Sequence, residues 1–168
     1  GVRECRDLPH TVGLVTNLDG HLAERVMRSL QAEADRRARV LAKHRVASLA
    51  ELIATAPQHA PASLVVVFDE FKEALDKVPP SQDGVTFLAR VKSFAALGRA
   101  YGIHLILATQ TPEGVITEDL RNNVEQRIAL RVKSAETSRN IVGRPDAALI
   151  AKQTPGRAFA EVETGTVV

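Results

Sequence analysis

Two adjacent carboxylates follow the most apolar run of this sequence. The run LVVVF at residues 64–68 is uniformly apolar, and Asp69 and Glu70 come directly after it. An unbroken apolar run is typical of a parallel strand buried on both faces, and ligands of parallel sheets bind beyond the carboxyl ends of the strands. The first carboxylate could hold a magnesium ion through water, and the second could polarise an attacking water molecule.

This run with its two acids has the form of a Walker B motif, but a simpler interpretation stays open. Asp69 could cap the helix that follows, and Glu70 could lie in its first turn, where acidic side chains are favoured. Because short apolar runs that end in acids are common, the neighbouring strands must decide between the two interpretations.

A second predicted buried strand, at residues 103–109, leads to Gln110. The amide of Gln110 would stand beside the carboxylates, where it could sense a γ-phosphate or orient the water. The alternative is that Gln110 is a turn residue.

Two arginines accompany a third predicted strand at residues 127–132. Arg121 precedes this strand and Arg127 opens it. Both would approach the same sheet edge or a neighbouring subunit, and an arginine supplied across an interface can stabilise the charge that develops in phosphoryl transfer. For either arginine alone, a surface salt bridge is the simpler interpretation.

Other polar residues favour structural roles. Arg36, Arg37 and Arg39 are predicted on the solvated face of a long helix, and His104 inside a buried strand is predicted as a packed core residue. The five histidines lack ligand spacing, and Cys5 is the only cysteine, which excludes an internal disulfide and fits a reducing cytoplasm.

The elements that must position these residues alternate between strand and helix. The predicted strands lie at 10–16, 64–68, 103–109, 127–132 and 157–163, and the predicted helices lie from Leu22, at 48–54, 85–101 and 118–124, and from Ser134 to Val142, with a further turn after Pro145. Gly102 and Gly143 are placed to end helices. Strands separated by helical crossovers predict a mostly parallel sheet covered on both faces, the α/β class.

Composition bounds the function. The 168 residues are 45% hydrophobic and 25% charged, as in soluble globular proteins. A net charge of +2, from 22 basic and 20 acidic residues, predicts a mixed surface rather than the cationic stripe of an autonomous DNA binder. Aromatic residues, at 4%, offer no stacking platform for single strands. The apolar runs are too short to cross a bilayer, so any membrane link is expected elsewhere in a longer protein.

Five segments in order resemble one family. The segments LVVVFDEF, GIHLILATQTP, RIALRV, NIVGRPDAA and PGRAF are similar to the C-terminal part of an FtsK/SpoIIIE-type ATPase domain. Upstream, LPHTVGLVTNLDG and RSLQAEADRRARVL resemble the EccC branch, the hexameric ATPases of type VII secretion. The motifs are individually weak, but their order over nearly the whole chain is specific.

The resemblance implies a RecA-like P-loop NTPase fold, a ring of subunits, ATP hydrolysis between subunits and mechanical work on a translocated polymer. By position it implies that Asp69 is the Mg carboxylate and Glu70 the catalytic carboxylate. It implies that Gln110 is the sensor and that Arg127, or as second choice Arg121, is an arginine finger. Thr111 stands where the family commonly has arginine.

The sequence contains no G-x-x-x-x-G-K-[ST] phosphate loop. Without backbone amides and a lysine to cradle phosphates, Asp69 and Glu70 have little nucleotide to act on. We therefore expect residues 1–168 to be part of an ATPase domain that lacks its first strand, with negligible ATPase activity alone. The missing strand would be central, so its loss predicts unpaired strand edges and open apolar faces.

The resemblance implies that the complete protein is an ATP- and Mg-dependent motor for protein export. Its expected partners are its own subunits in a ring, other ATPase domains, membrane components of the secretion system and the exported protein. The chain would be a cytoplasmic domain of a membrane-anchored protein. A DNA translocase of the same superfamily and a degenerate domain kept for docking or regulation remain as alternatives, although the LPHTVGLVTNLDG segment favours secretion.

Overall fold

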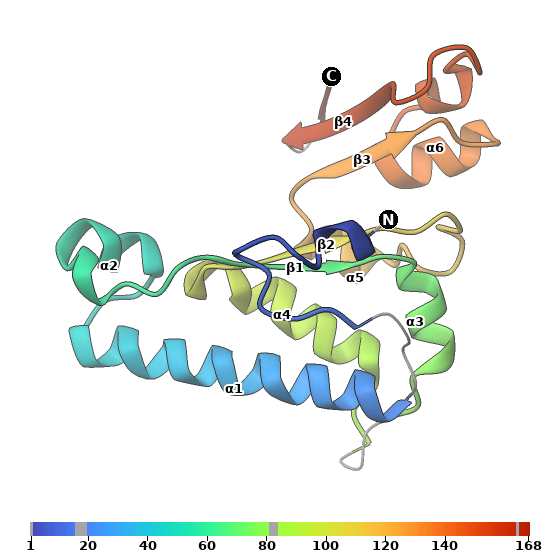
Figure 1. Cartoon of the computed structure of the whole chain (residues 1–168). Coiled ribbons are helices and arrows are strands. Elements are labelled where there is room, and N and C mark those ends of the chain that lie inside the picture. Colours follow the sequence, from blue (N-terminus) through green and yellow to red (C-terminus); the bar gives the residue numbers. More distant parts are fainter. Residues whose placement is uncertain (1, 16–19, 81–83, 164) are drawn as a thin grey trace. The chain divides into compact units, whose positions relative to one another are not determined.

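A computed structural model describes residues 2–15, 20–80, 84–163 and 165–168 (Figure 1). The chain divides into two compact units, Gly1–Thr109 (unit 1) and Gln110–Val168 (unit 2). The fold class is α/β, as predicted. No helix among the described residues is long and apolar enough to cross a membrane.

Unit 1 is built on two parallel strands. Its elements are η1 (Val2–Cys5), α1 (Gly20–His44), α2 (Leu49–Thr55), η2 (Pro57–His59), β1 (Leu64–Phe68), α3 (Phe71–Lys77), α4 (Phe87–Tyr101) and β2 (Ile103–Leu107). In the parallel ladder, Leu64 lies opposite Ile103 and Phe68 opposite Leu107. Helix α4 packs against β2, and α1 packs against α4 (Figure 1).

Local signals place the helix ends of unit 1. The Ser48 hydroxyl accepts the Glu51 N–H at 3.2 Å and so caps α2. Gly102 ends α4 in the left-handed conformation (φ 67°). A Cβ at Gly98 would lie 2.4 Å from the Ile103 carbonyl oxygen, so a side chain there would prevent α4 from packing this closely on β2.

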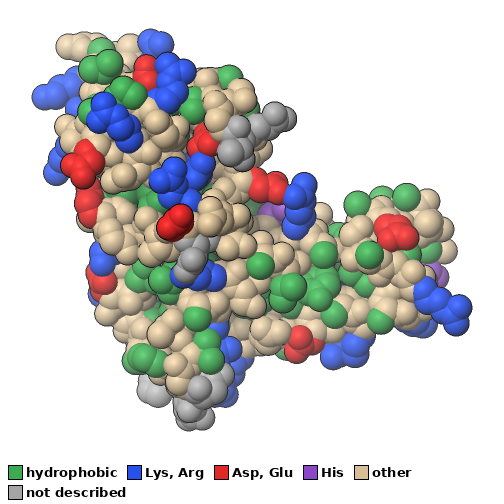
Figure 2. Space-filling model, turned by 180° about the vertical axis from the view of Figure 1, so that it is seen from behind, with side chains coloured by type: hydrophobic (Ala, Val, Ile, Leu, Met, Phe, Trp, Pro, Cys, Tyr) green, Lys and Arg blue, Asp and Glu red, His purple; other side chains and the backbone are tan. Residues whose placement is uncertain are grey.

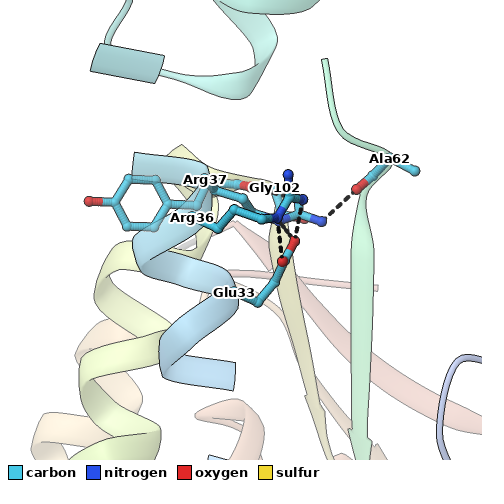
Figure 3. A network of polar contacts seen from close by, with 6 residues as sticks. Glu33, Arg36, Arg37, Ala62 and Gly102 are labelled. Carbon is cyan, nitrogen blue, oxygen red and sulfur yellow. Dashed lines mark hydrogen bonds and ion pairs between the residues drawn. The ribbon is translucent and has the colours of Figure 1, made fainter. Parts of the chain in front are cut away.

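The side chain of Arg37 lies inside unit 1 and joins three segments (Figure 3). It is 5% exposed. Its guanidinium donates to the carbonyl oxygens of Ala62 (2.7 Å), Tyr101 (2.9 Å) and Gly102 (3.3 Å), and to the Glu33 carboxylate (2.7 Å). These carbonyls lie one or two residues before β1 and β2, so Arg37 ties α1 to the starts of both strands.

The prediction that Arg37 lies on the solvated face of α1 was therefore wrong. Arg36 and Arg39 are exposed, as predicted. Arg36 binds Glu33 through two hydrogen bonds of 2.7 and 2.8 Å. The hydrogen bond from Arg36, and then the one from Arg37, lower the pKa of the Glu33 carboxyl to about 2 against the opposing effect of desolvation. Glu33 thus stays ionised and orients both guanidinium groups.

Within the described residues, only one face of the two-stranded sheet of unit 1 is covered. Val65 (55%), Val67 (49%) and Ile106 (51%) are exposed on the face opposite the core, and His104 beside them is exposed as well. The prediction of a sheet covered on both faces therefore does not hold for these two strands, and the prediction that His104 is a core residue was wrong. The open apolar face expected from the absence of the first strand is observed. The reason is that side chains alternate along a strand, and α4 covers only one of the two faces.

The predicted strand at residues 10–16 does not form in its described part. Residues 11–15 have no regular structure, Val12 is 88% exposed, and Thr16 lies outside the described residues. Here Thr11 N–H binds the Leu8 carbonyl in a turn. β-branched residues favour strands only where a neighbouring strand offers them pairing and packing.

Unit 2 contains α5 (Glu118–Asn123), β3 (Arg127–Leu130), α6 (Ala135–Val142), η3 (Asp146–Leu149), β4 (Ala158–Glu163) and β5 (Thr166–Val167). The strands form an antiparallel sheet in the order β3-β4-β5. The expected parallel pairing therefore holds for β1 and β2 and is wrong for β3, which pairs with β4.

Helix α6 covers β3 and closes the core of unit 2. The core is formed by Ala129, Val142, Ala147 and Ile150. Ser134 caps α6 and Gly143 ends it in the left-handed conformation, as predicted. The fully buried Ser138 hydroxyl donates to the Arg144 carbonyl and accepts the Ala147 N–H at 3.1 Å, so the turn after α6 is fixed to the helix.

Replacement of Arg37 should destabilise the protein strongly. In Arg37→Met the three carbonyls lose their buried donor, and we expect a loss of about 3 kcal/mol in the free energy of unfolding, measured in urea. The matched control is Arg36→Met, whose exposed pair with Glu33 should be worth less than about 1 kcal/mol. Equal losses in the two variants would contradict a structural role specific to Arg37.

Candidate functional site

The acidic pair lies in a tight turn at the carboxyl ends of the two parallel strands. Phe68 ends β1, and Phe71 begins α3. The Ala108 N–H binds the Phe68 carbonyl at 2.9 Å, and the Phe71 N–H binds the Ala108 carbonyl at 2.8 Å. These bonds hold the chain on both sides of Asp69 and Glu70. The pair is therefore positioned at the sheet edge where parallel sheets bind ligands.

Glu70 adopts a left-handed backbone conformation, with φ 55° and ψ 50°. For a residue other than glycine this conformation costs on the order of 1–2 kcal/mol, and such strain is concentrated at functional sites. The aromatic rings of Phe68, Phe71 and Phe87 pack against one another with centroids 5.6 to 6.1 Å apart. This cluster and the flanking hydrogen bonds hold the turn in its strained form.

The helix-capping interpretation of the pair was wrong. Glu70, not Asp69, is the N-cap residue of α3, and its side chain makes no capping hydrogen bond. The Asp69 side chain is exposed, and within the part of the chain that the structure describes it has no hydrogen bond or ion pair. Its carboxylate is therefore available for a ligand.

Gln110 is the first residue of unit 2 and follows Thr109, the last residue of unit 1. Its side chain is exposed. Chain connectivity thus keeps Gln110 three residues beyond the end of β2 at Leu107. The sensor role stays a prediction.

Arg127 forms a partly buried ion pair with Glu161. The two residues face each other across β3 and β4, and their side chains are 16% and 6% exposed. The backbone N–H of Gly165 also donates to Glu161, at 3.1 Å. This hydrogen bond, then Arg127 and the charge of Arg121, lower the pKa of the Glu161 carboxyl.

Arg121 and Arg127 thus both act on the charge of Glu161, but their surroundings differ. The Arg127 pair is interior rather than the surface salt bridge of the simpler interpretation, and its Nε is buried without a hydrogen-bond partner among the described residues. Arg121 is half-buried, and its side chain makes no hydrogen bond or ion pair in the described parts of the chain. Sequence reasoning missed Glu161, because only the register of β3 with β4 places it opposite Arg127.

The surroundings of Asp69 suit a hydrated magnesium ion better than a fully protein-bound metal. Across the described residues, no group of three or more His, Cys, Asp or Glu side chains is arranged to hold a metal ion. Magnesium bound with nucleotide commonly takes one or two carboxylates and completes its shell with water and phosphate oxygens. One free carboxylate at the strand end is sufficient for that mode of binding.

Relief of the strain at Glu70 should stabilise the protein. Glu70→Gly removes the energetic cost of the left-handed conformation, and this gain should exceed the cost of ordering the more flexible glycine backbone. We therefore expect the free energy of unfolding, measured in urea, to rise by about 0.5 kcal/mol. The control Glu73→Gly, inside α3, should lose about 1 kcal/mol. A destabilised Glu70→Gly variant would show that the left-handed turn is not strained.

Comparison with known proteins shows the family of this chain. Residues 2–160 match the FtsK/SpoIIIE family. The chain is 38% identical over 164 residues to the type VII secretion system protein EssC of Staphylococcus aureus (strain NCTC 8325 / PS 47), covering 94% of this chain and 10% of that protein. It is 32% identical to the ESX secretion system protein EccC of Geobacillus thermodenitrificans (strain NG80-2), covering 96% of this chain and 11% of that protein.

Solved structures share the fold. The cytoplasmic domain of the type VII secretion ATPase EccC of Thermomonospora curvata superposes with a TM-score of 0.73 at 32% identity, covering 88% of this chain and 17% of that one. The pCW3 conjugation coupling protein TcpA, solved as a monomer with ATPγS, has a TM-score of 0.75 at 24% identity, covering 89% of this chain and 43% of that one. The chain spans about a tenth of the length of the curated relatives it matches, and it belongs to the FtsK/SpoIIIE family.

Proposed function

We propose that this chain supplies the Walker B part of an ATP-hydrolysing motor domain for type VII protein secretion. The observation that carries the proposal is the strained turn at the end of β1, which presents Glu70 in a left-handed conformation beside the unpartnered carboxylate of Asp69. The similarity to EssC and EccC supports the secretion context.

The residues of the turn fit one part of an ATP–Mg site. Asp69 would hold magnesium through water, and Glu70 would orient and polarise the water molecule that attacks. When bound, magnesium would neutralise charge on the phosphate oxygens. This sequence has no G-x-x-x-x-G-K-[ST] segment to cradle the phosphates. We therefore propose that the 168-residue chain by itself hydrolyses ATP negligibly.

Gln110 and one arginine would complete the reaction centre. The amide of Gln110 suits the sensor role because Gln110 lies three residues beyond the end of β2 and is exposed. Of the two arginines, Arg127 is engaged by Glu161 in the interior of unit 2, whereas the Arg121 side chain has no hydrogen bond or ion pair among the described residues. The contacts thus favour Arg121 as the arginine finger that reaches a neighbouring subunit. Arg127 would instead stabilise the fold of unit 2 through its pair with Glu161.

The motor would work as part of a larger assembly. The proposed partners are further copies of the subunit in a ring, other ATPase domains, membrane components and the exported protein. The chain would lie on the cytoplasmic side of a membrane-anchored protein.

Transport of DNA instead of protein is the second candidate function, favoured only by the fold shared with the conjugation coupling protein TcpA. The third candidate function is that of a degenerate docking module, which would not require a strained backbone at Glu70.

A change at Glu70 should stop hydrolysis in a longer protein that contains this chain and a phosphate loop. We expect Glu70→Gln to lower kcat by roughly 100-fold or more, because the amide cannot act as a base. The change should leave magnesium-dependent ATP binding within about twofold, because nucleotide contacts remain. The assay is steady-state phosphate release, with nucleotide binding measured separately.

The matched control is Glu73→Gln, which alters an exposed acid of α3 that pairs with Lys77. Its hydrolysis should be unchanged. Full hydrolysis by Glu70→Gln would favour the docking module, and hydrolysis by the 168-residue chain alone would refute the need for an external phosphate loop.

The melting temperatures of two variants should distinguish the roles of Arg121 and Arg127. Arg121→Ala in the longer protein should lower kcat by roughly 1,000-fold, as loss of an arginine finger does, while the melting temperature stays unchanged. Arg127→Ala should lower the melting temperature, because Glu161 is left buried without its partner. If instead Arg127→Ala lost activity at an unchanged melting temperature, Arg127 would be the finger.

A further inference from the structure

The outer face of α1 carries a straight row of five basic side chains. With 3.6 residues per turn, the five fall within about 80° of the helix circumference and span roughly 27 Å along it. All five are exposed: Arg25, Arg28, Arg36, Arg39 and Lys43. The buried residues of α1, including Met27, Arg37 and Leu41, lie on the opposite side of the helix.

Three members of the row have no partner. Arg28 and Arg36 form ion pairs with Glu24 and Glu33 of the same helix. The side chains of Arg25, Arg39 and Lys43 have no hydrogen bond or ion pair to any residue that the structure describes. Like charges aligned on one face repel one another, so this row costs α1 stability that mixed charges would avoid.

Carboxylates border the row on both sides and make it narrow. Glu24 and Asp35 lie along one edge, and Glu33 lies along the other, by the same helical spacing. A bilayer surface, or a duplex much wider than a helix, would bring its anionic groups against these carboxylates as well as against the row. The helix has no Trp, Tyr or Phe, so it offers no stacking platform for a single strand. A narrow anionic partner is the one that this arrangement suits.

A protein helix with acidic residues on one face has the matching dimensions. Its carboxylates recur every three or four residues at the same 1.5 Å rise per residue as the cations of α1. The guanidinium groups can bind carboxylates through two hydrogen bonds each. Figure 2 shows one face of the molecule, on which basic and acidic side chains are interspersed.

We propose that the outer face of α1 is a docking surface for an acidic helical segment of a partner protein. The row is held rigidly, because α1 packs on α4 and Arg37 ties it to both strands of unit 1. The surface is separate from the turn at Asp69 and Glu70, so docking does not depend on the proposed hydrolysis.

The test uses a synthetic helical peptide of about 20 residues with Glu on one face at i, i+4 and i+7. A control peptide has the same composition with its glutamates spread around the helix. Binding to the 168-residue chain is measured by fluorescence anisotropy at low and at physiological salt. We expect the one-faced peptide to bind at least tenfold more tightly than the control peptide, with salt weakening the binding.

The variant Arg25→Gln/Arg39→Gln/Lys43→Gln should weaken this binding by roughly tenfold, because three charge pairs are lost. The matched control Lys133→Gln/Lys152→Gln/Arg157→Gln removes the same charge from exposed positions of unit 2 and should bind as the unchanged chain does. Gln preserves helix propensity, and thermal melting verifies the fold.

Three results would overturn the proposal. They are an absence of measurable peptide binding at low salt, equal binding of the two peptides, and equal weakening by the two triple variants. Tighter binding of duplex DNA or of anionic phospholipid vesicles than of the one-faced peptide, lost in the α1 variant, would assign the row to those ligands instead.

Discussion

The buried guanidinium of Arg37 is the interaction on which unit 1 depends. It fixes the chain just before β1 through Ala62 and just before β2 through Tyr101 and Gly102. The Gly102 carbonyl also accepts the Leu64 N–H at 2.9 Å, so the same oxygen sets the start of the strand register. A Cβ at Gly102 would lie 2.1 Å from a Leu49 side-chain atom, and no other residue fits there without displacement. The start of the ladder is thereby fixed by one cation and one glycine.

The register fixed at one end of the strands determines the chemistry at the other end. Because the strands are only five residues long, Phe68 and Leu107 must finish opposite each other once Leu64 and Ile103 are paired. The chain then turns within two residues into α3, which forces Glu70 into the left-handed region. Burial of the Phe68, Phe71 and Phe87 rings offsets that strain. Stability at the start of the sheet thus supports a strained, reactive geometry at its end.

Arginine has three physical roles in this chain, and burial distinguishes them. Arg37 satisfies carbonyls in the interior, Arg127 neutralises a buried carboxylate, and the arginines of the outer α1 face meet solvent. A buried guanidinium requires hydrogen-bond acceptors or a carboxylate partner, whereas an exposed one needs no fixed partner. The unpaired members of the exposed row are therefore available to a partner, whereas the buried arginines stabilise the fold.

The sequence by itself determined the local features. Helix ends at Gly102, Ser134 and Gly143 depend on neighbouring residues alone and were predicted correctly. Only the tertiary structure decided which α1 arginine is buried, which face of β1 is open, and that β3 pairs with β4 rather than continuing a parallel sheet. It also decided the left-handed backbone of Glu70 and the pairing of Glu161 with Arg127. Burial and pairing are contacts between segments distant in sequence, so no local pattern specifies them.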